Sequence, residues 1–145
     1  MGITTAMCTS FKGELLGGIH DLDTHTIKIA LIKASPSGTY NAATTNYSNV
    51  TGNSDESSGT NYSAGGQNLD SGAITTSGTT AMVDFADEVF SNVSTSADGC
   101  IIYNSSASNK AIAVIDFGGT VSATAGDLTI EFPAVGTSTA VIRIA

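Results

Sequence analysis

The sequence predicts an all-β fold: a single-domain antiparallel β-sandwich or jelly-roll-like structure with one short N-terminal helix and a long polar loop excursion. The 145 residues suit one domain, placed at residues 1–145. Charged residues make up only 12% of the chain, so Ser, Thr, Asn and Gly must cover the surface, and Ser and Thr suit strands and turns better than helix interiors. Short apolar runs separated by turn residues recur about every ten residues, which is typical of sandwiches and barrels.

A hairpin over residues 98–119 is the centre of the predicted fold. Its first apolar run is Gly99–Tyr103, its polar turn is Asn104–Asn109, and its second run is Lys110–Phe117. Both faces of the second run are largely apolar, as expected for a central strand covered on both sides. The β-branched residues and the flanking glycines favour a strand over a short buried helix.

One helix is predicted near the N-terminus, over residues 4–17. Four apolar side chains recur there at a spacing of four residues and form one stripe: Met7, Phe11, Leu15 and Ile19. The favoured interpretation is a helix whose apolar stripe lies on one face of the sheet. The alternative is that residues 1–20 form an arm that docks on a neighbouring subunit, which makes the same four side chains a candidate interface.

Residues 26–33 are predicted to form a strand, because apolar residues alternate and one face of the segment is wholly apolar. A break at Ser35–Gly38 follows. Residues 39–70 are then predicted to be a polar excursion, in which Asn, Ser, Thr and Gly dominate and which should be the most exposed and mobile part of the chain. A structureless loop of this length is unusual, so we expect one or two short strands within it, around Tyr62–Leu69.

The second half of the chain is more regular. Strands are predicted at seven short apolar or alternating runs: Ala73–Thr75, Thr80–Phe85, Glu88–Val93, Gly99–Tyr103, Ala111–Phe117, Asp127–Phe132 and Ala140–Ile144. Four turn clusters are expected to separate strands: Ser77-Gly78, Ser96–Gly99, Gly118-Gly119 and Ala125-Gly126. Asp84 and Asp87 are expected to flank a bend between two strands.

The formal charge is −8, from 13 acidic and 5 basic residues. A nucleic-acid binder needs a clustered basic face, so no nucleic-acid partner is expected. No run approaches the roughly 20 apolar residues that cross a bilayer. No secretory leader is recognised at Met1–Thr5. We therefore expect no membrane partner, and we expect Cys8 and Cys100 to be reduced, small apolar side chains.

The segment His20–His25 holds the only cluster of metal-type ligands in the sequence. A transition-metal site needs imidazoles and carboxylates that converge on one ion. The spacing here matches no specific ligand pattern, and the chain contains only 2 His. The favoured interpretation is a polar connector in which Asp23 caps the turn and both imidazoles are solvated. We therefore predict no metal and no cofactor.

No catalytic constellation is recognised. The chain has no Gly-x-Ser-x-Gly elbow, and Cys100 lies in the most apolar strand, where a thiol is expected to be buried and inert. Gly65-Gly66 and Gly118-Gly119 lack the Lys-Ser/Thr that follows in a phosphate loop, so both are interpreted as turns. The prediction is a protein that is not an enzyme and that works by burying surface against copies of itself or another protein.

Five segments carry a resemblance to a known family: Ile3–Leu16, Thr26–Leu31, Gly59–Gly66, Ile101–Gly118, and the ending from Phe132-Pro-Ala to a strand that finishes in Ile-Arg-Ile. In this order, over nearly the whole chain, they resemble small virion proteins of tailed bacteriophages. The resemblance implies a virion structural role with no catalytic residues. The sequence departs from the family over residues 41–58.

Small size, acidity and an all-β build lead us to expect a capsid decoration or cement protein, which binds the outside of the major-capsid shell and bridges its subunits. The expected partners are the major capsid protein and further copies of the chain, as a dimer or trimer. The expected location is the capsid surface of the virion, after synthesis in the host cytoplasm. One alternative is a tail, fibre or head-completion component. An alternative from another class is a carbohydrate-binding β-sandwich, which would present exposed aromatic residues.

Overall fold

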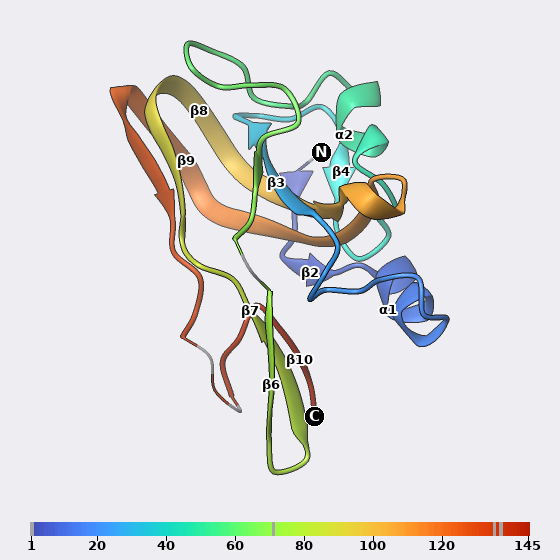
Figure 1. Ribbon diagram of the computed structural model, residues 1–145. Coiled ribbons are helices and arrows are strands. Elements are labelled where there is room, and N and C mark those ends of the chain that lie inside the picture. The colour runs from blue at the N-terminus through green and yellow to red at the C-terminus, as the bar shows by residue number, and fades with distance from the viewer. Residues whose placement is uncertain (1, 71, 135, 137) are drawn as a thin grey trace.

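The computed structural model describes residues 2–70, 72–134, 136 and 138–145. The largest sheet has five strands in the order β2-β9-β8-β3-β5, and all of its pairings are antiparallel. Its strands are β2 (Ala6–Met7), β3 (Ile27–Lys33), β5 (Gln67–Asn68), β8 (Glu88–Asn104) and β9 (Lys110–Ile130). Figure 1 shows β8 and β9 as the longest elements. The predicted all-β class is confirmed.

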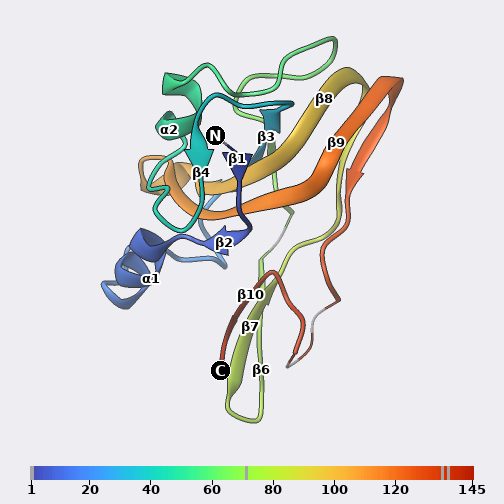
Figure 2. The ribbon, with the colours of Figure 1, turned by 180° about the vertical axis from the view of Figure 1, so that it is seen from behind.

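The remaining strands form two smaller sheets. One is antiparallel, with the order β10-β7-β6, and the other is a parallel pair of β1 and β4. Their strands are β1 (Gly2–Ile3), β4 (Thr39–Tyr40), β6 (Ala73–Ser77), β7 (Thr80–Asp84) and β10 (Ile142–Ile144). Figures 1 and 2 both show the β10-β7-β6 sheet projecting below β8 and β9. Asp84 and Asp87 flank the bend between β7 and β8, as predicted, and the Asp87 carboxylate accepts a hydrogen bond from the Phe132 N–H at 2.8 Å.

The predicted central hairpin is confirmed. Its paired register runs from Gly99 opposite Asp116 to Asn104 opposite Lys110. The turn contains a short 3₁₀ helix, η1 (Ser105–Ala107), whose first N–H groups are capped by the Asn104 side chain, which accepts from Ser106 N–H at 3.0 Å. The apolar side chains of this hairpin and of β3 form the centre of the core: Ile29, Leu31, Ile101, Ile102, Ile112 and Val114.

The strands of the second half are longer than predicted. The runs expected at Glu88–Val93 and Gly99–Tyr103 both belong to β8, and the runs at Ala111–Phe117 and Asp127–Phe132 largely share β9. Figures 1 and 2 show β8 and β9 running together as a ribbon that turns sharply near its middle. The prediction of four separate strands was therefore wrong, because β8 and β9 stay paired around the bend.

The bend lies where two of the expected turns face each other. Ala97 pairs with Val121 and Gly99 pairs with Asp116, so β9 has several more residues than β8 across this step. Gly118, with φ of 77°, lies in the extra segment. Glycine adopts this backbone conformation without steric cost, and such bulges bend a strand pair. The turn signals therefore mark a bulge in a continuous ribbon and not a reversal of the chain.

The N-terminal helix is shorter than predicted. The helix α1 spans Thr9–Leu16, whereas the prediction covered residues 4–17. The backbone of Ala6–Met7 pairs instead with β9, as strand β2, opposite Val114 and Ala113. Local propensity allowed a helix here, but pairing with a sheet edge satisfies the same backbone groups. Neither α1 nor α2 (Ser48–Gly52) is a candidate membrane span, and the structure describes no other helix that is.

The polar excursion is more ordered and less exposed than expected. Residues 39–70 contain β4, α2 and β5, and the last of these confirms the short strand predicted around Tyr62–Leu69. Six of its residues are buried: Tyr40, Thr44, Val50, Asp55, Ser57 and Leu69. The segment is largely exposed, as expected, but it is not the most exposed part of the chain: every residue of β6 is exposed, whereas apolar anchors and the Asp55 carboxylate hold the excursion onto the core.

Candidate functional site

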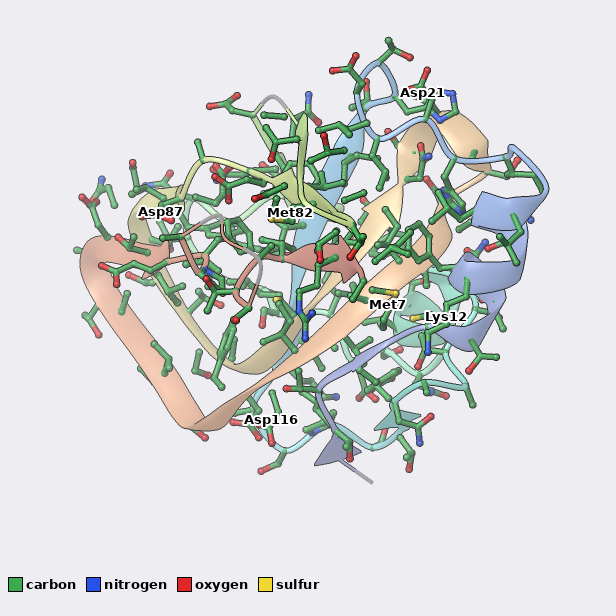
Figure 3. All side chains as sticks on the ribbon, turned by 90° about the horizontal axis from the view of Figure 1, so that it is seen from below. Met7, Lys12, Asp21, Met82, Asp87 and Asp116 are labelled. Carbon is green, nitrogen blue, oxygen red and sulfur yellow. The ribbon has the colours of Figure 1, made fainter. Side chains whose placement is uncertain are left out.

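The four side chains of the predicted interface do not form one stripe. Met7 lies on β2 beside β9, Phe11 is fully buried in the core, Leu15 is half-buried, and Ile19 lies beyond α1 with 42% of its surface exposed. Figure 3 shows Met7 and Lys12 on the side of the molecule that carries α1, with Asp87 on the opposite side. Since the helix begins only at Thr9, the spacing of four residues is not continued along one helical face. The Phe11 ring packs on His20, with ring centroids 4.9 Å apart, so it serves the core and presents no surface to a partner.

Exposed apolar side chains are found instead at the end of α1 and on the projecting small sheet. Leu16 is 91% exposed, Ile144 54% and Ile74 52%. No pattern in the sequence singles out Ile74 or Ile144 as contact residues. The alternation of apolar and polar residues in β6 and β10 was a signal for strands but not for which face is covered.

The small sheet has one apolar face, built in two rows across its strands. Ile74 pairs with Val83, which pairs with Ile142, and the next row joins Thr76, Ala81 and Ile144. Residues directly opposite one another project from the same face of a sheet. This face and the end of α1 enclose a groove of about 390 Å³, called here the α1–β10 groove. Its principal apolar walls are Leu15, Leu22, Ile74, Val83, Ile142 and Ile144.

A second groove has a volume of about 500 Å³. It is lined by β2, by both parts of the bent β9, and by the segment that follows β9, and its walls include Met7, Val114, Phe117, Leu128 and Phe132. Both grooves are mainly apolar and carry few ionisable groups in their walls. Such surfaces are suited to contact with another apolar surface and not to acid–base chemistry.

The two imidazoles of the His20–His25 segment converge on one amide. Asn104 Nδ2 lies 3.0 Å from His20 Nδ1 and 2.9 Å from His25 Nδ1, and the Ser106 N–H fixes the amide by donating to its oxygen. His20 Nε2 lies 3.3 Å from Glu14 Oε1. Among the residues that the structure describes, no group of three His, Cys, Asp or Glu side chains could hold a metal ion.

Two details of the predicted connector are corrected. His20 is buried, not solvated, because the turn brings it under Phe11 and against Asn104. Asp21, not Asp23, caps the turn: its carboxylate accepts from the N–H groups of Asp23 and Thr24, both at 3.1 Å. The hydrogen bond from the Thr24 hydroxyl and these two N–H groups lower the pKa of Asp21. The hydrogen bonds of His20 and His25 to Asn104 therefore hold the segment after α1 against the central hairpin.

Cys8 and Cys100 are both free and buried, as predicted. Burial raises the pKa of Cys100 to about 12. Burial, with a smaller contribution from Glu14, raises the pKa of Cys8 to about 11. Since the thiolate is the nucleophile, neither residue is activated for covalent chemistry.

Two adjacent carboxylates fasten the polar excursion. Asp55 is fully buried, and it accepts hydrogen bonds from Tyr40 Oη at 2.6 Å, Ser37 N at 2.9 Å and Gly38 N at 2.7 Å. Its Oδ1 also lies 3.1 Å from Lys33 Nζ. Burial alone would raise the pKa of Asp55, but these hydrogen bonds outweigh it and hold the pKa well below its usual range. No local sequence pattern predicts this role, because Asp55 lies in a polar segment.

Glu56 organises a cluster of tyrosines. Its carboxylate accepts hydrogen bonds from Tyr47 Oη, from Tyr62 Oη at 2.9 Å and from Gly65 N at 2.7 Å. Tyr47 stacks on Tyr103 with ring centroids 4.5 Å apart. Burial, followed by the negative charge of Glu56, raises the pKa of Tyr103 to about 12. The phenols therefore remain neutral hydrogen-bond donors at neutral pH.

Comparison with models of protein families, with curated proteins and with solved structures finds no match to this chain. The arrangement of its side chains is therefore the basis for a functional argument. In the part of the chain that the structure describes, the ionisable groups noted above make structural contacts, and the two grooves are lined mainly by apolar side chains.

Proposed function

We propose that this chain is a structural protein of a bacteriophage virion and, within that class, a decoration or cement protein of the capsid shell. The resemblance of five sequence segments to small phage virion proteins suggests the class. The all-β fold and the absence of a metal-ligand cluster from the described residues are compatible with a protein that works through its surface. The observation that carries the proposal is the set of exposed apolar side chains around the α1–β10 groove.

In this proposal, the partner at the groove is a subunit of the major-capsid shell. Exposed apolar surface of this kind is stabilised when a second protein covers it, at about 25 cal/mol per Å² of apolar area removed from water. A stable attachment buries about 1,600 Å² in total, so the groove would be the centre of a larger contact. The ionisable side chains in its walls are His20 and Asp21, and attachment should therefore depend only weakly on salt.

The Leu16→Glu variant tests the contact surface. Leu16 is 91% exposed, so the substitution should leave the melting temperature nearly unchanged while placing a charge on the contact. We expect binding to shells that lack the protein to fall at least tenfold, since burying an unpaired carboxylate costs about 2 kcal/mol or more. Co-sedimentation of the purified variant with such shells measures this.

Val89→Glu is the matched control, because Val89 is a partly exposed apolar residue on β8 that is not next to any wall of the groove, whereas Leu16 directly follows the wall residue Leu15. The control should bind shells like the unmodified protein. Equal loss in both variants, or full binding by Leu16→Glu, would contradict the assignment of the α1 end as the contact.

The number of copies per particle separates decoration from the other virion roles. A shell protein is expected at hundreds of copies, because it follows the symmetry of the capsid, whereas tail, fibre or head-completion components are present in a few to dozens. Quantitative mass spectrometry of purified particles, with the major capsid protein as the internal standard, measures this. A ratio far below that of the capsid subunit would favour the tail or fibre alternative.

The carbohydrate-binding alternative receives less support from the geometry. The chain has 4 Tyr, 5 Phe and no Trp, and each of these aromatic side chains is buried or half-buried. Tyr47, Tyr62 and Tyr103 are held in the Glu56 cluster and face inward. Sugar-binding surfaces present aromatic faces beside polar groups, and specific binding on a glycan array would be needed to restore this alternative.

A further inference from the structure

Strand β6 is an open edge of the projecting small sheet. Among the residues that the structure describes, it pairs only with β7, and all five of its residues, Ala73–Ser77, are exposed. Residues 72–83, which span β6 and most of β7, contain no charged residue and no proline. Natural proteins usually protect an open edge with lysine, proline, a bulge or a covering element. This edge has none of these, although the chain as a whole carries a charge of −8.

The hairpin register shows which backbone groups the open edge presents. Ser77 pairs with Thr80 across the two-residue turn Gly78-Thr79, and the closing pair of such a hairpin exchanges hydrogen bonds. Hydrogen-bonded and non-hydrogen-bonded pairs alternate along an antiparallel ladder. The N–H and C=O groups of Ile74 and Thr76 therefore point away from β7. No backbone hydrogen bond joins either residue to another element among the residues described.

We infer that a second copy of this chain pairs with β6, antiparallel and about a twofold axis through Thr75. In this register, Ile74 of each copy lies opposite Thr76 of the other. The two hydrogen-bonded pairs then use the four N–H and four C=O groups of Ile74 and Thr76 in the two copies, which form four hydrogen bonds. The result is a continuous sheet of six strands, β10-β7-β6-β6-β7-β10, across the dimer.

The charge distribution favours a second copy over a partner of opposite charge. A basic partner would find no acidic side chain on β6 to recognise. A second copy brings no like charges together at the contact. The nearest acidic residue within the two strands of the hairpin is Asp84, and the two Asp84 residues of a dimer would be at least three strand spacings, about 14 Å, apart. This exceeds the Debye length of about 8 Å at physiological ionic strength, so their repulsion is screened.

The contact also extends the apolar face of the small sheet. Ile74 is 52% exposed in the single chain. In the dimer it lies beside Thr76 of the second copy and so extends that copy's row of Thr76, Ala81 and Ile144. A ladder of five residues is smaller than the interface of a permanent dimer, which buries about 1,600 Å² or more. The dimer should therefore dissociate in the micromolar range.

The Thr76→Pro variant tests the pairing with little expected effect on the monomer. Proline removes an N–H that points to the open edge and is not used by β7, and proline is tolerated at such edge positions. Thr76→Val is the matched control, since it keeps the N–H and the β-branched shape. In sedimentation velocity across the micromolar range, the unmodified protein and Thr76→Val should show a monomer–dimer equilibrium, whereas Thr76→Pro should weaken the dimer about tenfold or more.

Amide hydrogen exchange on the unmodified protein gives a second, independent measurement. The amides of Ile74 and Thr76 should exchange fast in dilute protein and become protected at concentrations where the dimer forms. The amide of Thr75, already bonded to β7, should be protected at low and at high protein concentration. A single-chain mass at every concentration, a trimer, or a dimer that Thr76→Pro leaves intact with Ile74 and Thr76 unprotected would overturn the inference. These outcomes concern β6 alone, so they leave the proposed role in the virion to be judged by its own experiments.

Discussion

The Gly66→Ala variant is expected to lose about 3 kcal/mol or more of unfolding free energy, the most severe effect of a single methyl group that the structure predicts. Gly66 has φ of 73°, and a Cβ atom there would lie 1.8 Å from the carbonyl oxygen of Ile29 and 2.8 Å from Cα of Ala30. Both neighbours are backbone atoms of β3, so they cannot rotate away as a side chain would. The methyl group must displace the end of the excursion from the sheet. Urea unfolding followed by circular dichroism measures the loss.

Gly18→Ala is the matched control for this prediction. Gly18 has nearly the same backbone conformation, with φ of 75°, but a Cβ atom there would meet nothing within 4 Å. Its loss should therefore be only that of placing a non-glycine residue at positive φ, about 1 kcal/mol. Equal losses in the two variants would contradict the close approach of Gly66 to β3.

The Asp55→Asn variant is expected to lose about 2–3 kcal/mol of unfolding free energy at neutral pH, because the buried carboxylate accepts several hydrogen bonds that are strengthened by its charge. The substitution keeps the shape but removes the charge that Lys33 Nζ approaches at 3.1 Å. It also places an amide group where the carboxylate accepts from Tyr40 Oη and Gly38 N. These donors lie in or beside β4, so the first part of the excursion should lose its attachment to Asp55.

The stability that Asp55 provides should also depend on pH. Its pKa in the folded protein is held below the ordinary value of 3.8, because hydrogen bonds to the carboxylate outweigh the effect of burial. A lowered folded pKa provides stability that is fully present above the unfolded pKa and is lost as the pH falls below it. The difference in unfolding free energy between the unmodified protein and Asp55→Asn should therefore be constant from about pH 5 to 7 and shrink below about pH 4.

Asp21→Asn is the control for the size of the loss. Asp21 also accepts two backbone N–H hydrogen bonds, but it is exposed at the surface. Its replacement should cost much less than that of Asp55, because water can solvate the turn. A loss as large as that of Asp55→Asn would show that burial of the carboxylate is not the cause. No dependence of the Asp55 effect on acid pH would contradict the stabilisation of its charged form by hydrogen bonds.

The sequence predicted the centre of this fold because the central strands are apolar on both faces. In Ile27–Lys33 and Lys110–Phe117, nearly every core position is filled by a β-branched or small apolar residue, and no alternative structure buries them as well. The same reasoning was weaker at the N-terminus. Ala6 and Met7 are good helix formers, and only the presence of an open edge on β9 decided that they form a strand.

The candidate surface could be predicted only in part. Spacing alone suggested a stripe through Met7, Phe11, Leu15 and Ile19, but a spacing pattern does not say which apolar residues the core will take. Phe11 is buried in the core, whereas Leu16, at the end of the same helix, lies at the surface. The role of Asp55 could not be predicted for a related reason. A carboxylate in a polar segment is expected to be solvated, and only the tertiary structure shows the groups that donate hydrogen bonds to it.

The sequence by itself determined the all-β class, the central hairpin and the buried thiols, since these depend on local composition and on the period of the apolar residues. Only the tertiary structure decided that two expected turns are a bulge in one long ribbon, that the polar excursion is fastened by Asp55 and Glu56, and that β6 is left as an open edge. Each of these depends on which distant backbone or side chain satisfies a hydrogen-bonding group. For the bulge and for Asp55, that partner lies 15 or more residues away along the chain, beyond the reach of a local pattern.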